Sequence, residues 1–65
     1  MDKLSPRELE ILNWVVKGLT NAEIAQNTGI TIETVKAHLK SIYKKLNVKN
    51  RVQALLYVMQ NSTLK

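Results

Sequence analysis

The chain has 65 residues, enough for one small domain, which we expect to span residues 1–65. It has no cysteine, and this excludes disulfides, thiolate metal sites and cysteine nucleophiles. Ten Lys and Arg against five Asp and Glu give a net charge of +5, which favours a polyanionic partner such as nucleic acid.

A first helix is predicted near residues 6–17. Ser5 is a suitable N-cap, Pro6 suits the first helical position, and Glu8 completes a capping box with Ser5. Gly18 supplies the stop. The inward face is expected to consist of Ile11, Leu12, Val15 and Val16.

A second, short helix is predicted near residues 21–28, with Thr20 or Asn21 as its cap and Ile24 and Ala25 facing the core. Gly29 can adopt the positive φ of a sharp turn, and Thr31 can cap a third helix near residues 32–46. A short helix, a glycine turn and a longer helix are typical of a helix-turn-helix, whose second helix enters the major groove of DNA.

The third helix is expected to be divided into an apolar face and a cationic face. At 3.6 residues per turn, one stripe consists of Val35, Leu39, Ile42 and Leu46. The opposite side carries Glu33, Lys36, Ala37, Lys40 and Lys44. The first stripe suits a core and the second suits a polyanion, so the fold class is predicted to be all-α.

A fourth helix is predicted near residues 51–60, capped by Asn50 with Gln53 three residues on. Its core face is expected to consist of Val52, Leu55, Leu56 and Met59. The roughly opposite face carries Ala54, Tyr57 and Val58. These three residues indicate either an interface with a second copy of the chain or ordinary exposed apolar side chains.

Three separated motifs give the chain a resemblance to the LuxR-type DNA-binding domain. They are L-S-P-R-E-x-E-I-L from Leu4 to Leu12, G-L-T-N-x-E-I-A from Gly18 to Ala25, and T-V-K-x-H from Thr34 to His38. The family includes quorum-sensing regulators and the C-terminal output domains of longer two-component response regulators. The resemblance implies a four-helix domain that regulates transcription by binding double-stranded DNA as a homodimer through its fourth helix.

Carried onto this chain by motif position, the resemblance implies base contacts from Lys36, Ala37 and Lys40, with Thr34 beside them within reach of a phosphate. Lys can donate to guanine, and an Ala methyl can pack against a thymine methyl. Phosphate contacts are expected from groups that border the recognition helix: Asn21, Lys44, Lys45, Lys49, Asn50 and Arg51.

We expect no catalysis, no metal and no cofactor. His38 is the sole histidine and has no second ligand at metal spacing, so it is interpreted as a packing residue at the edge of the core. Trp14 is likewise interpreted as a packing residue.

A soluble, cytoplasmic protein is expected, because no apolar run is long enough to span a membrane and no signal peptide is evident. The alternative function is a protein-interaction module that docks an acidic partner, such as an RNA polymerase subunit, on the same basic face.

Overall fold

The computed structural model describes residues 3–61, and within them it contains four helices and no strand. These are α1 (Pro6–Val16), α2 (Asn21–Thr28), α3 (Ile32–Leu46) and α4 (Arg51–Gln60). The all-α prediction is confirmed, and the bounds of α2, α3 and α4 are those predicted. α1 ends one residue early, because Lys17 serves as its C-cap. None of these helices has the length and hydropathy needed to cross a membrane.

A side-chain cap begins every one of these helices. In each case the capping oxygen accepts a hydrogen bond from the backbone N–H three residues on. α1 and α2 carry complete capping boxes, in which a glutamate side chain also accepts a hydrogen bond from the backbone N–H of the cap residue. The caps are Ser5, Thr20, Thr31 and Asn50. Local chemistry therefore accounts for where the helices begin.

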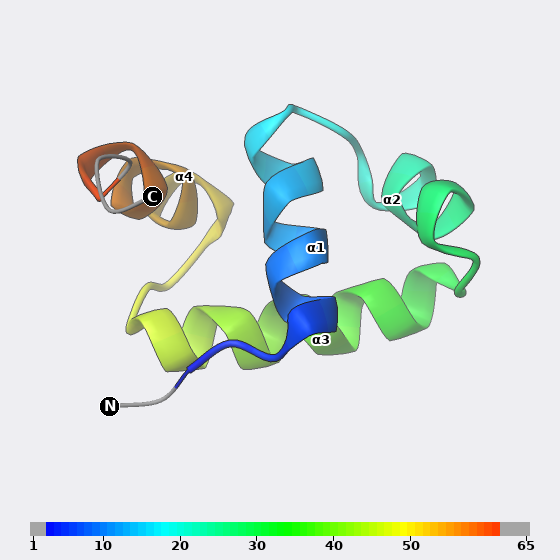
Figure 1. Cartoon of the computed structure of the whole chain (residues 1–65), viewed down its shortest axis with the longest axis horizontal. Coiled ribbons are helices and arrows are strands. Elements are labelled where there is room, and N and C mark those ends of the chain that lie inside the picture. The colour runs from blue at the N-terminus through cyan, green and yellow to red at the C-terminus, as the bar shows by residue number, and fades with distance from the viewer. Residues whose placement is uncertain (1–2, 62–65) are drawn as a thin grey trace.

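α3 is the base on which the domain is assembled. Figure 1 shows α1, α2 and α4 on one side of α3, whose opposite side is left open. α3 packs against each of the other three helices, whereas the backbones of α2 and α4 do not approach each other closely. The buried cluster joins α1, α2 and α3 through Ile11, Leu12, Val15, Ile24, Ala25, Val35, Leu39 and Ile42.

Two predicted core faces are wrong in part. Val16 is exposed, because it lies at the edge of the α1 stripe. α4 is turned around relative to the prediction: Ala54 is fully buried, while Val52, Leu56 and Met59 are 65%, 49% and 60% exposed. α4 is apolar on two sides, and the small Ala54 permits a closer approach to the core than larger side chains do.

A buried carboxylate joins the start of α1 to the end of α3. Glu8 Oε1 accepts hydrogen bonds from Lys45 Nζ and the Ser5 backbone N–H, both at 2.8 Å. Its Oε2 accepts from Ser41 Oγ, also at 2.8 Å. The residue is only 5% exposed. Glu8 therefore caps its own helix and holds α3 in place.

These bonds lower the pKa of Glu8 from 4.5 to about 2, with the Lys45 bond the largest cause, followed by the bonds from Ser5 and Ser41. Between these two values the unfolded chain binds more protons than the folded chain. Glu8 thus stabilises the fold above about pH 4.5, and this contribution is lost as the pH falls toward about 2.

The turn between α2 and α3 depends on a left-handed residue. Gly29 has φ 73° and ψ 25°, and its N–H donates to the carbonyl of Ala25 at 2.9 Å. A Cβ added at Gly29 would meet no atom within 4 Å. The demand for glycine at this position is therefore conformational and not steric crowding by neighbours. The predicted positive φ of the turn is confirmed.

We expect Gly29→Val to lower the free energy of unfolding by about 1 to 2 kcal/mol, because a β-branched residue resists positive φ. Gly29→Asn should cost less, since Asn tolerates this region and Asn47 already occupies it at φ 59°. Urea unfolding followed by circular dichroism measures both. Equal losses for the two variants would contradict the conformational explanation.

Candidate nucleic-acid interface

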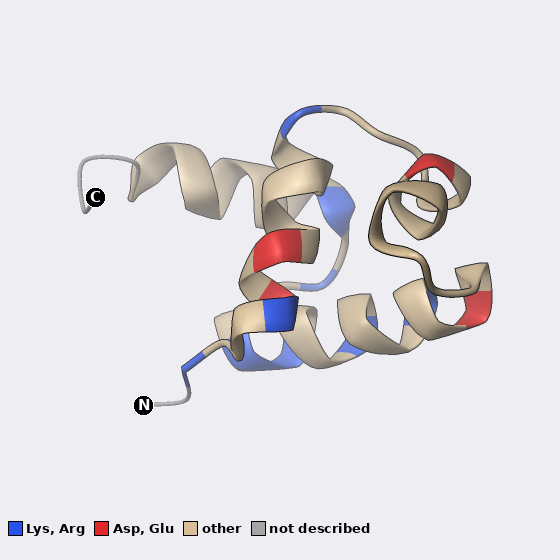
Figure 2. Ribbon diagram, turned by 45° about the vertical axis from the view of Figure 1, so that its right-hand side comes forward, with Lys and Arg blue, Asp and Glu red and all other residues tan. Residues whose placement is uncertain are grey.

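The open side of α3 presents the three predicted base-contacting residues together. Lys36, Ala37 and Lys40 are all exposed. They lie on the side of the helix opposite to the buried Val35 and Leu39. Figure 2 shows Lys and Arg along α3, while acidic residues mark α1, α2 and the start of α3. The cationic face predicted from the sequence is therefore present as an accessible surface, here called the α3 basic face and defined by Lys36, Ala37, Lys40 and Lys44.

One acidic residue lies beside this face. Glu33 Oε2 is 3.8 Å from Lys36 Nζ, and the two side chains are 84% and 59% exposed. An ion pair this exposed contributes little free energy, so it leaves Lys36 able to exchange Glu33 for a stronger anion.

Thr34 lies in the first turn of α3 and is exposed. Its Oγ1 is 2.9 Å from Oγ1 of the N-cap Thr31, and its backbone N–H donates to that same oxygen at 3.1 Å. These bonds link the N-cap to the first turn of α3. The positive end of the helix dipole lies here, which suits an anion.

The predicted phosphate-contacting cations separate into two groups. Lys44 and Lys49 are exposed. Lys45 has partners within the domain, because its Nζ lies 2.8 Å from Glu8 Oε1 and 3.4 Å from the carbonyl of Lys3. The ammonium group of Lys45 is thus used to stabilise the fold.

Arg51 likewise has partners within the domain. Its Nη1 donates to Oδ1 of Asn21 at 2.9 Å, and its Nη2 donates to the carbonyl of Leu19. Arg51 and Asn21 are both partly buried. The neighbouring Asn50 is exposed, but its Oδ1 accepts the Gln53 N–H as the α4 cap. Arg51 is therefore held within the domain by the start of α2.

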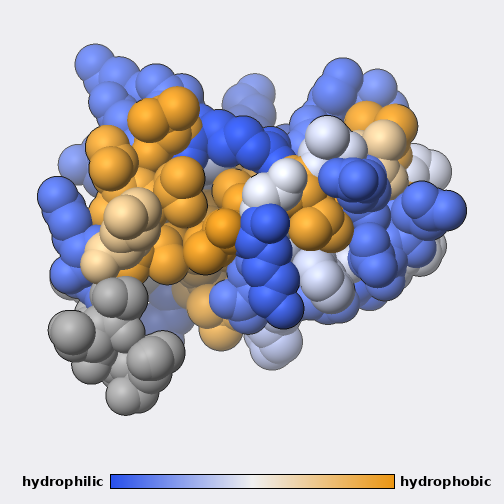
Figure 3. Space-filling model, turned by 90° about the horizontal axis from the view of Figure 1, so that it is seen from above, coloured by the Kyte–Doolittle hydropathy of each residue, from blue (hydrophilic) through white to orange (hydrophobic). Residues whose placement is uncertain are grey.

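α4 exposes a cluster of large apolar side chains, Val52, Leu56 and Met59, here called the α4 apolar patch. Hydrophobic surface gathers over α4 in the view of Figure 3. The predicted interface residues lie elsewhere: Ala54 is inaccessible, Val58 packs against the core, and only Tyr57, at 37%, is appreciably exposed.

A sequence signal for the outward side of α4 was available but was missed. Gln53 and Gln60 are one heptad apart, and both are exposed. The helical period places Leu56 beside them, which marks its side of α4 as the outer one.

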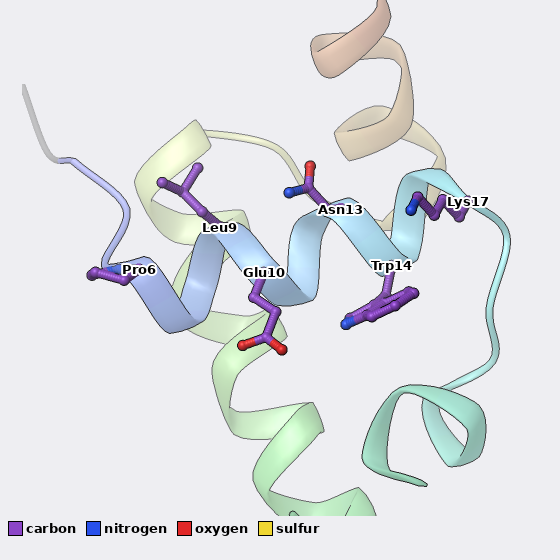
Figure 4. A pocket seen from close by; sticks show the side chains of 6 residues that line it. All are labelled: Pro6, Leu9, Glu10, Asn13, Trp14 and Lys17. Atoms are coloured by element: carbon purple, nitrogen blue, oxygen red, sulfur yellow. The ribbon is translucent and has the colours of Figure 1, made fainter. Parts of the chain in front are cut away.

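A hollow of about 450 Å³ lies on the outer face of α1 (Figure 4). Its lining includes Leu9, Glu10 and Trp14, on the side of α1 away from the buried Ile11 and Val15. The hollow is therefore separate from the α3 basic face.

The predicted packing residues are only partly exposed. Trp14 packs against the core cluster, and Lys17 Nζ lies 5.1 Å from its ring centroid. The Trp14 Nε1 is buried and has no hydrogen-bond partner among the described residues. His38 is half-buried, beside the buried Val35 and Leu39 of the same helix. Residues 3–61 hold no group of three or more His, Cys, Asp or Glu arranged to bind a metal ion.

Comparison with known proteins places these features in a family. The sequence of residues 2–58 matches the family model of the bacterial regulatory proteins of the luxR family. The chain is 44% identical over 63 residues to the response regulator protein VraR of Staphylococcus aureus and of Staphylococcus epidermidis. The match covers 97% of this chain and 30% of those relatives, so the chain spans less than a third of their length.

Two solved structures share the fold. One is the anti-activator RapF in complex with the DNA-binding domain of the response regulator ComA, with a TM-score of 0.84 and 42% identity over 88% of this chain and 98% of that one. The other is the response regulator ChrA of a haem-sensing two-component system, with a TM-score of 0.87 and 42% identity over 95% of this chain and 31% of that one. The predicted family resemblance is confirmed.

We expect Lys45→Gln to lower the free energy of unfolding by about 2 kcal/mol at pH 7, because buried Glu8 loses its charged partner. As the pH falls from about 4.5 toward about 2, the variant should lose less stability than the wild type does, because the Lys45 bond is the largest cause of the low Glu8 pKa. Lys44→Gln, which removes the adjacent exposed charge, is the matched control and should do neither. Thermal unfolding at a series of pH values tests this, and identical curves for the two variants would contradict it.

Proposed function

The chain belongs to the luxR family of bacterial regulatory proteins, a family of DNA-binding transcription regulators, and from this premise we propose that it binds double-stranded DNA sequence-specifically as a dimer. The observation that carries the proposal is the α3 basic face, exposed on the open side of a helix-turn-helix. We propose a non-catalytic role, in the cytoplasm where bacterial DNA lies.

α3 is proposed to enter the major groove. A helix of 15 residues is about 22 Å long and narrow enough for a groove about 12 Å wide. Lys36 and Lys40 can donate to guanine O6 and N7, and the Ala37 methyl can pack against a thymine methyl. Nearby phosphates are assigned to groups whose exposure leaves them accessible: Thr34, Lys44, Lys49 and Asn50.

The dimer is proposed to form through the α4 apolar patch instead of the residues predicted from the sequence. Val52 and Leu56 are one helical turn apart, and Met59 continues the same stripe. A patch on a single helix can pack against its own copy about a two-fold axis. Such an axis matches a DNA site made of two related halves.

A protein partner is the second candidate, and the RapF complex favours it, because a 42% identical domain is bound there by an anti-activator. The α3 basic face offers such a partner, or an RNA polymerase subunit, a complementary surface if the partner is acidic. Under this alternative the identities of Lys36 and Lys40 matter only as positive charges.

Selection of duplexes from a randomised pool at near-physiological salt tests base readout. We expect enrichment of a two-fold related site by the wild type and a changed preference for Lys36→Ala and Lys40→Ala, since one bidentate contact discriminates by about 1 to 3 kcal/mol. Lys17→Ala, which removes an exposed charge at the end of α1, should leave the preferred sequence unchanged. If the domain retains duplexes but enriches no sequence, it is a phosphate binder without base readout. If it retains no duplex, the acidic protein partner is favoured.

We expect Leu56→Glu to weaken binding to the selected two-site duplex by tenfold or more, about 1.4 kcal/mol, because it places a charge within the α4 apolar patch. Affinity for a single half-site should change much less. Asn13→Glu, on the exposed face of α1, adds the same charge away from α4 and serves as the control. Electrophoretic mobility shifts measure both affinities. An unchanged two-site affinity would remove this dimer assignment.

A further inference from the structure

We propose that Arg51 is a positioning residue, which ties the start of α2 to the start of α4 and turns the Asn21 amide into a hydrogen-bond donor for the DNA backbone. This inference rests on the proposed function. It assigns Arg51 a role that differs from the direct phosphate contact expected from its charge and position in the sequence.

The geometry shows a side-chain bridge between two helices whose backbones do not approach each other closely. Arg51 is the first residue of α4, and Asn21 is the first residue of α2. The bond from Arg51 Nη1 to Asn21 Oδ1 is 2.9 Å, and Nη2 reaches the carbonyl of Leu19 in the connection before α2. No close backbone approach joins α2 and α4 across residues 3–61. The Arg51 guanidinium thus connects α4 to the start of α2.

The chemistry of the bond determines which end of the Asn21 amide is used. A guanidinium has only donors, so it can bind the amide oxygen and not the amide nitrogen. Oδ1 is therefore committed to Arg51, and Nδ2 keeps its two N–H donors for another acceptor. Asn21 lies at the N-terminus of α2, where the helix dipole attracts an anion. A DNA phosphate is the acceptor that both properties favour.

The same bonds argue against Arg51 as a phosphate contact. Two of its five N–H donors, one on each terminal nitrogen, already bond within the domain and hold the guanidinium against Asn21 and Leu19. Lysine cannot reproduce this bridge, since its ammonium is a single point and lacks the planar fork that spans two acceptors. A direct phosphate contact, by contrast, requires mainly a positive charge, which lysine supplies.

The bridge also has a consequence for the dimer. Arg51 is adjacent to Val52 of the α4 apolar patch, so the side chain that holds α2 begins on the helix proposed to meet the second copy. The placement of α4 in the dimer thereby sets the placement of the α2 N-terminus on the phosphate backbone.

The first test compares the affinity of Arg51→Lys and of the wild type for the selected duplex over a series of salt concentrations. It is made at a temperature well below the unfolding midpoint, so that both proteins are folded. We expect affinity to fall about tenfold while the slope of log K against log salt stays the same, because the charge is kept and the bridge is lost. Lys49→Gln, the matched loss of a neighbouring exposed charge, should instead reduce the slope by about 0.9. Retained affinity in Arg51→Lys would overturn the proposal, because either a direct phosphate contact or a purely structural role predicts it.

The second test uses Asn21→Asp, which keeps an acceptor for Arg51 and suits the first turn of a helix, but removes the donor. Stability should be kept while DNA affinity falls. Adding Arg51→Lys to Asn21→Asp should cost no further affinity if Arg51 acts through Asn21, whereas independent contacts would give multiplied losses and overturn the proposal.

A measurement without DNA separates this inference from the proposed function. Hydrogen exchange of the Glu23 and Ile24 backbone amides, which donate to Thr20 at the start of α2, should be faster in Arg51→Lys than in the wild type, and in Lys49→Gln it should be unchanged. Unchanged exchange in Arg51→Lys would overturn the positioning role even if the wild type binds DNA. Faster exchange in a domain that binds no duplex would mean that the proposed function fails, and the DNA part of this inference with it.

Discussion

The two-sided character of α3 is the constraint on which the rest of the domain depends. A chain of 65 residues without a disulfide can build only one small core, and α3 provides the surface on which the other helices pack. The same helix must leave its other side to solvent, where the lysines lie. Residues such as Val35 and Lys36 are neighbours in sequence, yet one is fully buried and the other is exposed. One face of α3 therefore stabilises the core, while the other presents the lysines to solvent.

Positive charge has two different uses in this molecule. Lys44 is exposed to solvent, while the adjacent Lys45 is bound to a buried carboxylate. Lys49 is exposed, while Arg51, two residues on, bridges to the start of α2. Net charge alone therefore overstates the number of cations available to a polyanion. Those bound inside hold in place the helices that present the others.

The sequence predicted helix positions closely because the signals are local. Ser5 and Asn50 each accept the backbone N–H three residues on, as the local signals predict. Glu8 completes the capping box with Ser5, whereas the Gln53 side chain accepts from the backbone N–H of Lys49 and not from that of Asn50. The orientation of α4 was predicted wrongly, because Val52 and Ala54 are both apolar and only packing against α1 and α3 decides which is buried. The partners of Lys45 and Arg51 were missed for a related reason, since they lie 37 and 30 residues away in the chain.

The capping bonds also have a consequence for the order of events in folding. α1 and α2 each close a complete capping box within four consecutive residues, so both helix starts can form before any distant contact exists. Chains dominated by such local contacts fold in about microseconds to milliseconds, because little loop-closure entropy is lost before favourable contacts form. The bonds of Glu8 to Ser41 and Lys45 require the end of α3 and can form only later. The starts of α1 and α2 thus need no distant partner, whereas the bonds from α3 to the buried carboxylate need α1 and α3 to have met.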